Sequence, residues 1–221
     1  MNIADSIIRK RLKNVYFIWG RGKTTIAGKL HNKYGFYIYS TDLHRDRLRK
    51  EADPSDQPYM CRDYEKEYGV SDFWELPREV IADREQHFVE EMTPMMVVDL
   101  ITLAERHKVV ICEGDIDYEA IARVATHMVH LRRNCGTAFD WFGRPDHRNS
   151  LDSLQKRTDL SDAAKNAIIE NARETVSADD RVLPDWVTRL NIQNIDWDDN
   201  TSIEQTALEV EKVFGFGGQN L

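Results

Sequence analysis

The strongest constraint on the fold is a short, unbroken apolar run near the N-terminus. Residues 15–19 read VYFIW and lead directly into the glycine-containing stretch GRGKTT. An apolar run without polar alternation, bounded by glycine, is typical of a strand that is buried on both faces. Ile26, Leu30 and Tyr34 then share one helical face, and Gly35 is a good helix stop. The segment therefore predicts a strand, a tight loop and a helix.

Strands and helices alternate along the rest of the chain. Further strands are predicted at 36–40, 109–113, 127–131 and 190–195. Helices are predicted at 42–50, 117–125, 150–175 and 202–214, with two long helices, marked by Pro77 and Pro94, within 72–107. This alternation predicts an α/β fold in which a five-stranded parallel sheet lies between layers of helices.

The length of 221 residues and the lack of an obvious linker predict one domain over 1–221. Within this domain, 54–105 is predicted to be a helical insertion over one end of the sheet.

Composition limits the function classes. The net charge of −8 argues against an extended nucleic-acid partner, since phosphate-binding surfaces are usually basic. No apolar stretch approaches the length of a membrane span, so no membrane partner is expected. The three scattered cysteines form no C-x-x-C pair, which indicates a reducing, cytoplasmic compartment.

The loop after the first strand matches the end of the phosphate-binding pattern G-x-x-x-x-G-K-[ST]. Gly22, Lys23 and Thr24 occupy its last three positions, whereas Phe17 stands where the first glycine is expected. Because phenylalanine does not adopt positive φ easily, we expect Gly20 to make the turn and the loop to be shorter than usual.

A loop between a strand and a helix suits nucleotide phosphates, because backbone N–H groups and the helix dipole point at the anion. Lys23 is predicted to reach the β- and γ-phosphates, and the Thr24 hydroxyl to ligate Mg²⁺. Arg21 adds favourable charge, and Thr25 is placed to contact the α-phosphate. The alternative is a strand–turn–helix unit with a surface lysine.

The chain resembles the P-loop small-molecule kinases, the group of shikimate, gluconate, chloramphenicol and polynucleotide kinases. The resemblance covers most of the chain and is strongest in WGRGKTTIAGKL, STDLHRDRL and VVICEGD. It implies a three-layer P-loop NTPase fold, ATP as phosphate donor and Mg²⁺. It also implies that the insertion lies on the acceptor side.

In these kinases an aspartate after the second strand lies near the acceptor hydroxyl, and Asp42 occupies that position. A carboxylate there can accept the hydroxyl proton. The D-x-x-R spacing to Arg45 resembles that of polynucleotide kinases and zeta toxins, where the arginine holds the acceptor. The alternative is that Asp42 or Thr41 caps a helix and that Arg45 lies in solvent.

Glu113 ends the third predicted strand, in the usual position of a Walker B acid. It is expected to hold Mg²⁺ through water or to position the acceptor, and Asp115 and Asp117 are weaker candidates for acceptor contacts. A charged group at the end of a buried strand is costly without partners, which favours a site at Glu113. The alternative is a solvated acidic loop.

The resemblance also implies a lid at 136–150 that closes over ATP. Arg144 and Arg148 are predicted to stabilise charge on the transferred phosphoryl group, with Arg132 and Arg133 as second choices. The alternative is a polar surface loop.

Together these features predict an ATP- and Mg²⁺-dependent kinase that phosphorylates a hydroxyl of a small molecule. Asp42, Lys23, Arg144 and Arg148 are the predicted catalytic residues. One alternative is a nucleoside, nucleotide or polynucleotide 5′-kinase, and another is a non-catalytic nucleotide-binding regulatory module. The acceptor, the choice of ATP or GTP and the oligomeric state stay open.

Overall fold

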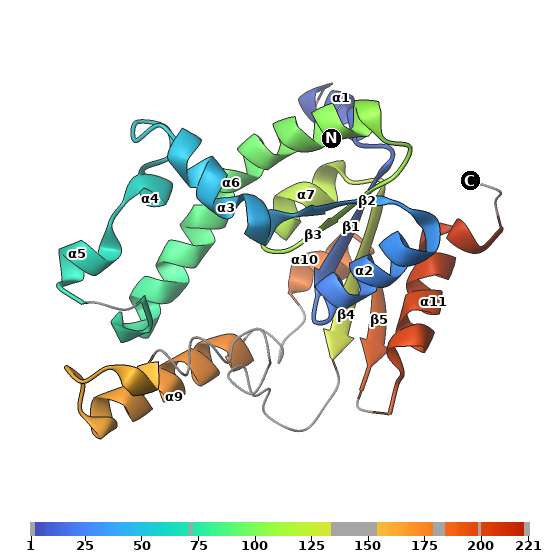
Figure 1. Ribbon diagram of the computed structural model, residues 1–221. Coiled ribbons are helices and arrows are strands. Elements are labelled where there is room, and N and C mark those ends of the chain that lie inside the picture. The colour runs from blue at the N-terminus through green and yellow to red at the C-terminus, as the bar shows by residue number, and fades with distance from the viewer. Residues whose placement is uncertain (1–2, 71–72, 134–153, 179–183, 199, 219–221) are drawn as a thin grey trace. The chain divides into compact units, whose positions relative to one another are not determined.

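The computed structural model of the chain is shown in Figure 1. It describes residues 3–70, 73–133, 154–178, 184–198 and 200–218. The chain divides into two compact units. The first consists of residues 1–61, 87–135 and 184–221, and the second of residues 62–86 and 136–183.

Five parallel strands form the sheet of the first unit, in the order β2–β3–β1–β4–β5. The strands are β1 (Val15–Gly20), β2 (Tyr37–Ser40), β3 (Val110–Glu113), β4 (His127–Arg133) and β5 (Gln193–Trp197). β1 is central and pairs with both β3 and β4. The predicted five-stranded parallel sheet is therefore confirmed. All five carboxyl ends meet at one edge of it.

One face of the sheet is covered by α2 (Lys23–Tyr34) and α11 (Ile203–Phe214) (Figure 1). Ile18 of β1 packs there in one buried cluster with Leu30 of α2 and Val210 of α11. β1 carries apolar or aromatic side chains on both faces, as the apolar run indicated, so helices can pack against both of them.

The opposite face is covered by α6 (Arg78–Arg106) and α7 (Tyr118–Val124). Phe17 of β1 packs there with Met92 and Met96 of α6 and Ile121 of α7. Helices on both faces of the parallel sheet make the fold three-layered, as predicted. The described part of the first unit also contains α1 (Ile3–Arg11), α3 (Thr41–Glu51), α4 (Pro58–Cys61), α10 (Asp185–Arg189) and the 3₁₀ turn Phe216–Gly218.

The prediction of two long helices within 72–107 is wrong, because α6 continues through Pro94. Phe88, Met92 and Met96 recur at four-residue spacing and are all buried, so packing of one face holds the helix together despite the backbone donor that proline lacks. The Thr93 hydroxyl also donates to the Val89 carbonyl at 2.6 Å.

The last strand begins later than predicted. β5 covers Gln193–Trp197 rather than 190–195, and the short helix α10 precedes it. Asn191 has φ of +53° and makes the turn between them, a conformation that asparagine tolerates better than most residues. Leu190 and Ile192 are partly buried against the cluster around Phe17, so their apolar character reflects packing in a turn and not in a strand.

The second unit contains α5 (Tyr64–Tyr68), the 3₁₀ turn Phe73–Glu75 and α9 (Asp162–Ala178), together with the first turns of α6. The Asn171 side-chain amide donates to the carbonyls of Trp74 and Leu76 at 2.9 and 3.1 Å, which ties α9 to the turn. Of the predicted insertion at 54–105, residues 62–86 fall in this unit and the remainder in the first.

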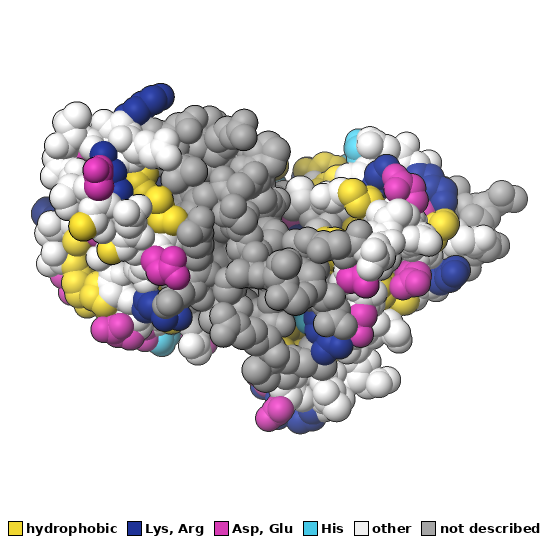
Figure 2. Space-filling view, turned by 90° about the horizontal axis from the view of Figure 1, so that it is seen from below, with side chains coloured by type: hydrophobic (Ala, Val, Ile, Leu, Met, Phe, Trp, Pro, Cys, Tyr) yellow, Lys and Arg dark blue, Asp and Glu magenta, His cyan; other side chains and the backbone are white. Residues whose placement is uncertain are grey.

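Among the described residues, no helix is long and apolar enough to cross a membrane. Figure 2 shows one face of the molecule, on which the described acidic and basic side chains are interspersed.

We predict that Gly20→Ala destabilises the first unit by on the order of 2–4 kcal/mol. Gly20 has φ of +96°, and a Cβ at this position would lie 2.1 Å from the Leu131 carbonyl oxygen. Urea unfolding followed by circular dichroism measures the loss.

Gly28→Ala is the matched control, since Gly28 lies inside α2 with nothing within 4 Å of a Cβ. It should leave stability unchanged or raise it by up to about 1 kcal/mol. Equal effects of the two substitutions would contradict the steric argument.

Candidate active site

The loop between β1 and α2 consists of only two residues, Arg21 and Gly22. Gly20, the last residue of β1, has φ of +96°, and Gly22 has φ of +85°. Phe17 is fully buried within β1, so the chain leaves the strand three residues later than the usual pattern would have it. The turn is therefore made by Gly20, and the loop is short.

The first turn of α2 offers backbone donors beside this loop. Gly22 is the N-cap residue and makes no side-chain capping hydrogen bond. The first helical bond within α2 runs from the Ile26 N–H to the Gly22 carbonyl, at 3.0 Å. A glycine N-cap cannot supply a side-chain acceptor to the N–H groups of Lys23, Thr24 and Thr25, and a phosphate oxygen is a suitable acceptor for such groups.

Thr24 and Glu113 meet at the carboxyl edge of the sheet. The Thr24 hydroxyl donates to Glu113 Oε2 at 2.7 Å. Glu113 ends β3 and is only 2% exposed, so its carboxylate depends on partners of this kind. The contact joins the first turn of α2 to the end of β3, and it brings together the two residues predicted to ligate Mg²⁺.

Lys23 lies beside a second acid of the same segment. Its ammonium nitrogen is 3.5 Å from an Asp115 carboxylate oxygen. The Asp115 side chain is 56% exposed, so this ion pair is weak. A phosphate group could exchange with Asp115 as the partner of Lys23 at small cost.

A close contact between the end of β3 and the start of α3 brings Asp42 toward Glu113. Gly114 has φ of +111°, and a Cβ there would lie 2.1 Å from the Thr41 hydroxyl oxygen. Thr41 is buried and begins α3, and Asp42 follows it. The absence of a side chain at Gly114 therefore allows the start of α3 to pack against the end of β3.

Asp42 is exposed in the first turn of α3, and Ser40 is the N-cap residue. Neither Thr41 nor Asp42 is the N-cap residue, so the capping alternative is wrong. The Arg45 guanidinium lies over the Phe88 ring of α6, 4.1 Å from its centre. The other half of the alternative placed Arg45 in solvent, whereas its side chain packs on Phe88.

Tyr118 organises the acidic turn between β3 and α7. Its hydroxyl donates to the Gly114 carbonyl. Burial, followed by the nearby carboxylates of Asp115, Glu113 and Asp42, raises the pKa of Tyr118 well above its usual value. The phenol consequently stays protonated and keeps its donor role at physiological pH.

Asp117 has a structural role that differs from the predicted one. Its carboxylate caps α7 by accepting from the Ala120 N–H at 3.0 Å. This bond occupies the side chain as a helix cap, which explains its position without an acceptor contact.

The predicted lid at 136–150, with Arg144 and Arg148, lies outside the described residues. Of the second choices, Arg132 forms a two-pronged ion pair with Asp196, its register neighbour on β5, at 2.7 and 3.0 Å. Arg132 therefore joins two strands, and Arg133 ends β4.

Two residues of this edge were missed by the sequence analysis, Tyr118 and Trp197. Trp197 ends β5, and its ring N–H donates to the Arg21 carbonyl at 3.2 Å. The signal that could have identified Trp197 was its place at the carboxyl end of a parallel strand, on the same edge as the glycine loop.

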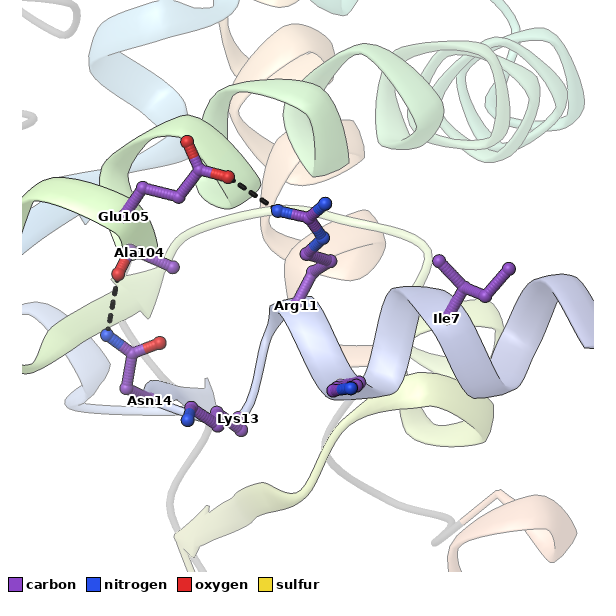
Figure 3. A pocket seen from close by; sticks show the side chains of 7 residues that line it. Ile7, Arg11, Lys13, Asn14, Ala104 and Glu105 are labelled. Carbon is purple, nitrogen blue, oxygen red and sulfur yellow. Dashed lines mark hydrogen bonds and ion pairs between the residues drawn. The ribbon is translucent and has the colours of Figure 1, made fainter.

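A hollow of about 500 Å³ lies away from this edge (Figure 3). Its walls come from α1, the segment before β1 and the end of α6, and the ion pair of Arg11 with Glu105, at 2.7 Å, lies beside it. Asn14 immediately precedes β1, so the hollow is near the amino end of that strand and is separate from the glycine loop at its carboxyl end.

No protein-family model matches the chain, and no curated protein matches it. Among solved structures, 26 chains match, including the dephospho-CoA kinase from Campylobacter jejuni. That match has a TM-score of 0.42 and 13% identity, and it covers 92% of this chain and 96% of that one. A similarity at this level supports no inference about activity, which must come from the chain's own site.

We predict that Thr24→Val destabilises the protein by about 1–3 kcal/mol, because the buried Glu113 carboxylate loses a hydrogen-bond donor. Thr24→Ser should retain most of the stability, since the hydroxyl remains. Thermal unfolding measures both variants.

Thr25→Val is the matched control, because Thr25 is an exposed threonine in the same helical turn. An equal loss at Thr25 would show that helix propensity, and not the hydroxyl–carboxylate bond, causes the effect.

Proposed function

We propose that the chain is an ATP- and Mg²⁺-dependent phosphotransferase that phosphorylates a hydroxyl group of a small molecule. The observation that carries the proposal is the contact of Thr24 with Glu113 beside the glycine loop. It joins a hydroxyl and a buried carboxylate at the edge where Lys23 and the first N–H groups of α2 also lie.

The phosphate groups of ATP would bind along Gly20, Arg21 and Gly22 and at the first turn of α2. Lys23 would exchange its exposed partner Asp115 for the β- and γ-phosphates. The backbone N–H groups and the positive end of the α2 dipole favour the same anion. Thr25, exposed in this turn, would contact the α-phosphate.

The donor set at this edge fits Mg²⁺, which is usually held by one or two protein oxygens together with phosphate oxygens and water. Thr24 and Glu113 would hold it, and its charge would offset that of the phosphates. In the described part of the chain no group of three or more acidic, histidine or cysteine side chains gathers to hold a metal ion by itself.

Asp42 would act as the base. It would accept the proton of the acceptor hydroxyl while that oxygen forms a bond to the γ-phosphorus, the bond to the bridging oxygen breaks, and ADP leaves. Asp42 directly follows Thr41, which lies against Gly114 at the end of β3. Arg45 and Asp115 would contact the acceptor, and Arg144 and Arg148 would stabilise the transferred group.

A small acceptor suits the charge of the protein better than a long polynucleotide, since the net charge is −8 and the acidic and basic side chains in Figure 2 are interspersed. Nucleosides and nucleotides remain possible acceptors within this proposal. The free thiols of Cys61 and Cys112 suit a reducing compartment, and we propose the cytoplasm.

One observation favours a second candidate, a nucleotide-binding regulatory module without transfer activity. The loop has two residues, so it offers fewer amides to phosphate than the usual pattern does. Binding and transfer must therefore be tested separately.

We predict that the protein binds MgATP and that Lys23→Ala weakens this binding roughly tenfold or more, about 1.4 kcal/mol. The reason is the loss of a cation at the proposed phosphate site. Isothermal titration calorimetry measures the affinities.

Lys29→Ala is the control, because Lys29 is on the same helix but pairs with Glu204 at 2.6 Å. It should leave the affinity unchanged. A folded wild-type protein that does not bind MgATP would disprove the proposed function.

We predict that Asp42→Asn keeps MgATP affinity but lowers phosphoryl transfer by roughly 10²–10⁴-fold, the usual contribution of a general base. The assay follows γ-labelled ATP with a panel of sugars, amino sugars and nucleosides. Asp46→Asn, an exposed aspartate one turn later in α3, should retain activity.

Wild-type binding without transfer to any compound in the panel would favour the regulatory module. Transfer that is equal in Asp42→Asn and the wild-type protein would exclude Asp42 as the base.

A further inference from the structure

Trp197 reaches the glycine loop from two strands away. It ends β5, which pairs with β4, and β4 in turn pairs with β1. Its ring N–H donates to the Arg21 carbonyl at 3.2 Å. A carbon of the same ring lies 3.3 Å from where a Cβ on Gly22 would be. One side chain therefore bonds to Arg21 and lies beside Gly22.

The backbone of Arg21 is held on both sides by neighbouring strands. Its N–H donates to the Leu131 carbonyl of β4 at 3.0 Å, and its C=O accepts from Trp197 of β5. The first bond continues the parallel pairing of Gly20 with Leu131. The second comes from a side chain, so a substitution can remove it without changing the strand pairing.

The bond to Trp197 also sets the direction of the next amide. The Arg21 carbonyl and the Gly22 N–H belong to one peptide plane, and the described chain contains no cis peptide bond. In a trans peptide these two groups point in opposite directions. Holding the carbonyl toward Trp197 therefore directs the Gly22 N–H away from it. This N–H directly precedes those of the first turn of α2.

The orientation of the Arg21–Gly22 peptide must be fixed by a contact from outside the loop, because Gly22 is a glycine. Glycine adopts positive and negative φ about equally well, so the Arg21–Gly22 peptide has little intrinsic preference. The usual phosphate loop has four residues between its glycines, whereas here only Arg21 separates Gly20 from Gly22. With so few amides, each one contributes a larger share of phosphate binding.

We propose that Trp197 is a positioning residue that fixes the Arg21–Gly22 peptide so that the Gly22 N–H binds a nucleotide phosphate. The proposal rests on the proposed function, because the ligand is the phosphate chain of ATP. Trp197 acts through the loop backbone.

The test is Trp197→Phe, which keeps an aromatic ring but removes the N–H donor. Hydrogen exchange of the ligand-free protein, followed by mass spectrometry over 19–27, reports on the loop without nucleotide. The Ile26 amide should exchange several-fold faster, since it is bonded to the Gly22 carbonyl of the loop. Calorimetry with MgATP should show roughly five- to tenfold weaker binding, as expected for one mispositioned donor.

Trp74→Phe is the matched control, a tryptophan of the second unit. It should change neither the exchange over 19–27 nor the affinity. Faster exchange confined to the loop, together with weaker MgATP binding, supports the proposal. Unchanged exchange and affinity in Trp197→Phe would overturn it, and so would faster exchange spread over all five strands, which would indicate a general loss of stability.

The two proposals can fail separately. If the wild-type protein binds no MgATP but Trp197→Phe still speeds exchange in the loop, the proposed function and the phosphate-binding role are overturned. The contact between Trp197 and the loop peptide is then still established.

Discussion

The site depends on the close approach of Gly20 to β4. A Cβ on this residue would lie 2.1 Å from the Leu131 carbonyl oxygen, so only glycine permits β1 to stay paired to its last residue and then turn at once. Because the turn is so tight, α2 begins after two residues and its first N–H groups lie at the sheet edge. A longer exit from the strand would have placed Lys23 and Thr24 elsewhere.

A second glycine contact assembles the acidic side of the site. Gly114 lets the start of α3 approach the end of β3, which brings Thr41 and Asp42 to the edge that carries Glu113. Tyr118 then holds the turn by donating to the Gly114 carbonyl. The two glycines serve the same physical purpose, since each removes a side chain where two backbone segments must nearly touch.

The charges at this edge differ in how firmly they are held. Glu113 is buried and bonded to Thr24, whereas Asp115 is exposed and lies 3.5 Å from Lys23. Breaking the first pair leaves a buried charge without its donor, while breaking the second costs little in water. Of these four side chains, Lys23 and Asp115 can therefore exchange partners at the least cost, as the proposed phosphate binding requires.

The sequence by itself determined the elements whose cause is local. The apolar runs predicted the five parallel strands, and the glycines predicted a shortened turn before Lys23. It failed where packing overrode a local rule. Pro94 lies inside α6 because the buried face of the helix outweighs one missing donor, and the last strand was placed too early because Leu190 and Ile192 are partly buried in the turn before it.

Only the tertiary structure decided which distant residues meet. Thr24 and Glu113 are 89 positions apart, and Arg21 and Trp197 are 176 apart. Such contacts depend on strand order and register, and both follow from the packing of the whole sheet, which no local pattern contains. Lys23, Thr24 and Glu113 could thus be identified as candidates from the sequence, whereas Tyr118 and Trp197 were missed. The pairing of the site residues, and the hydrogen bond from Trp197 to the loop, could not be predicted from the sequence.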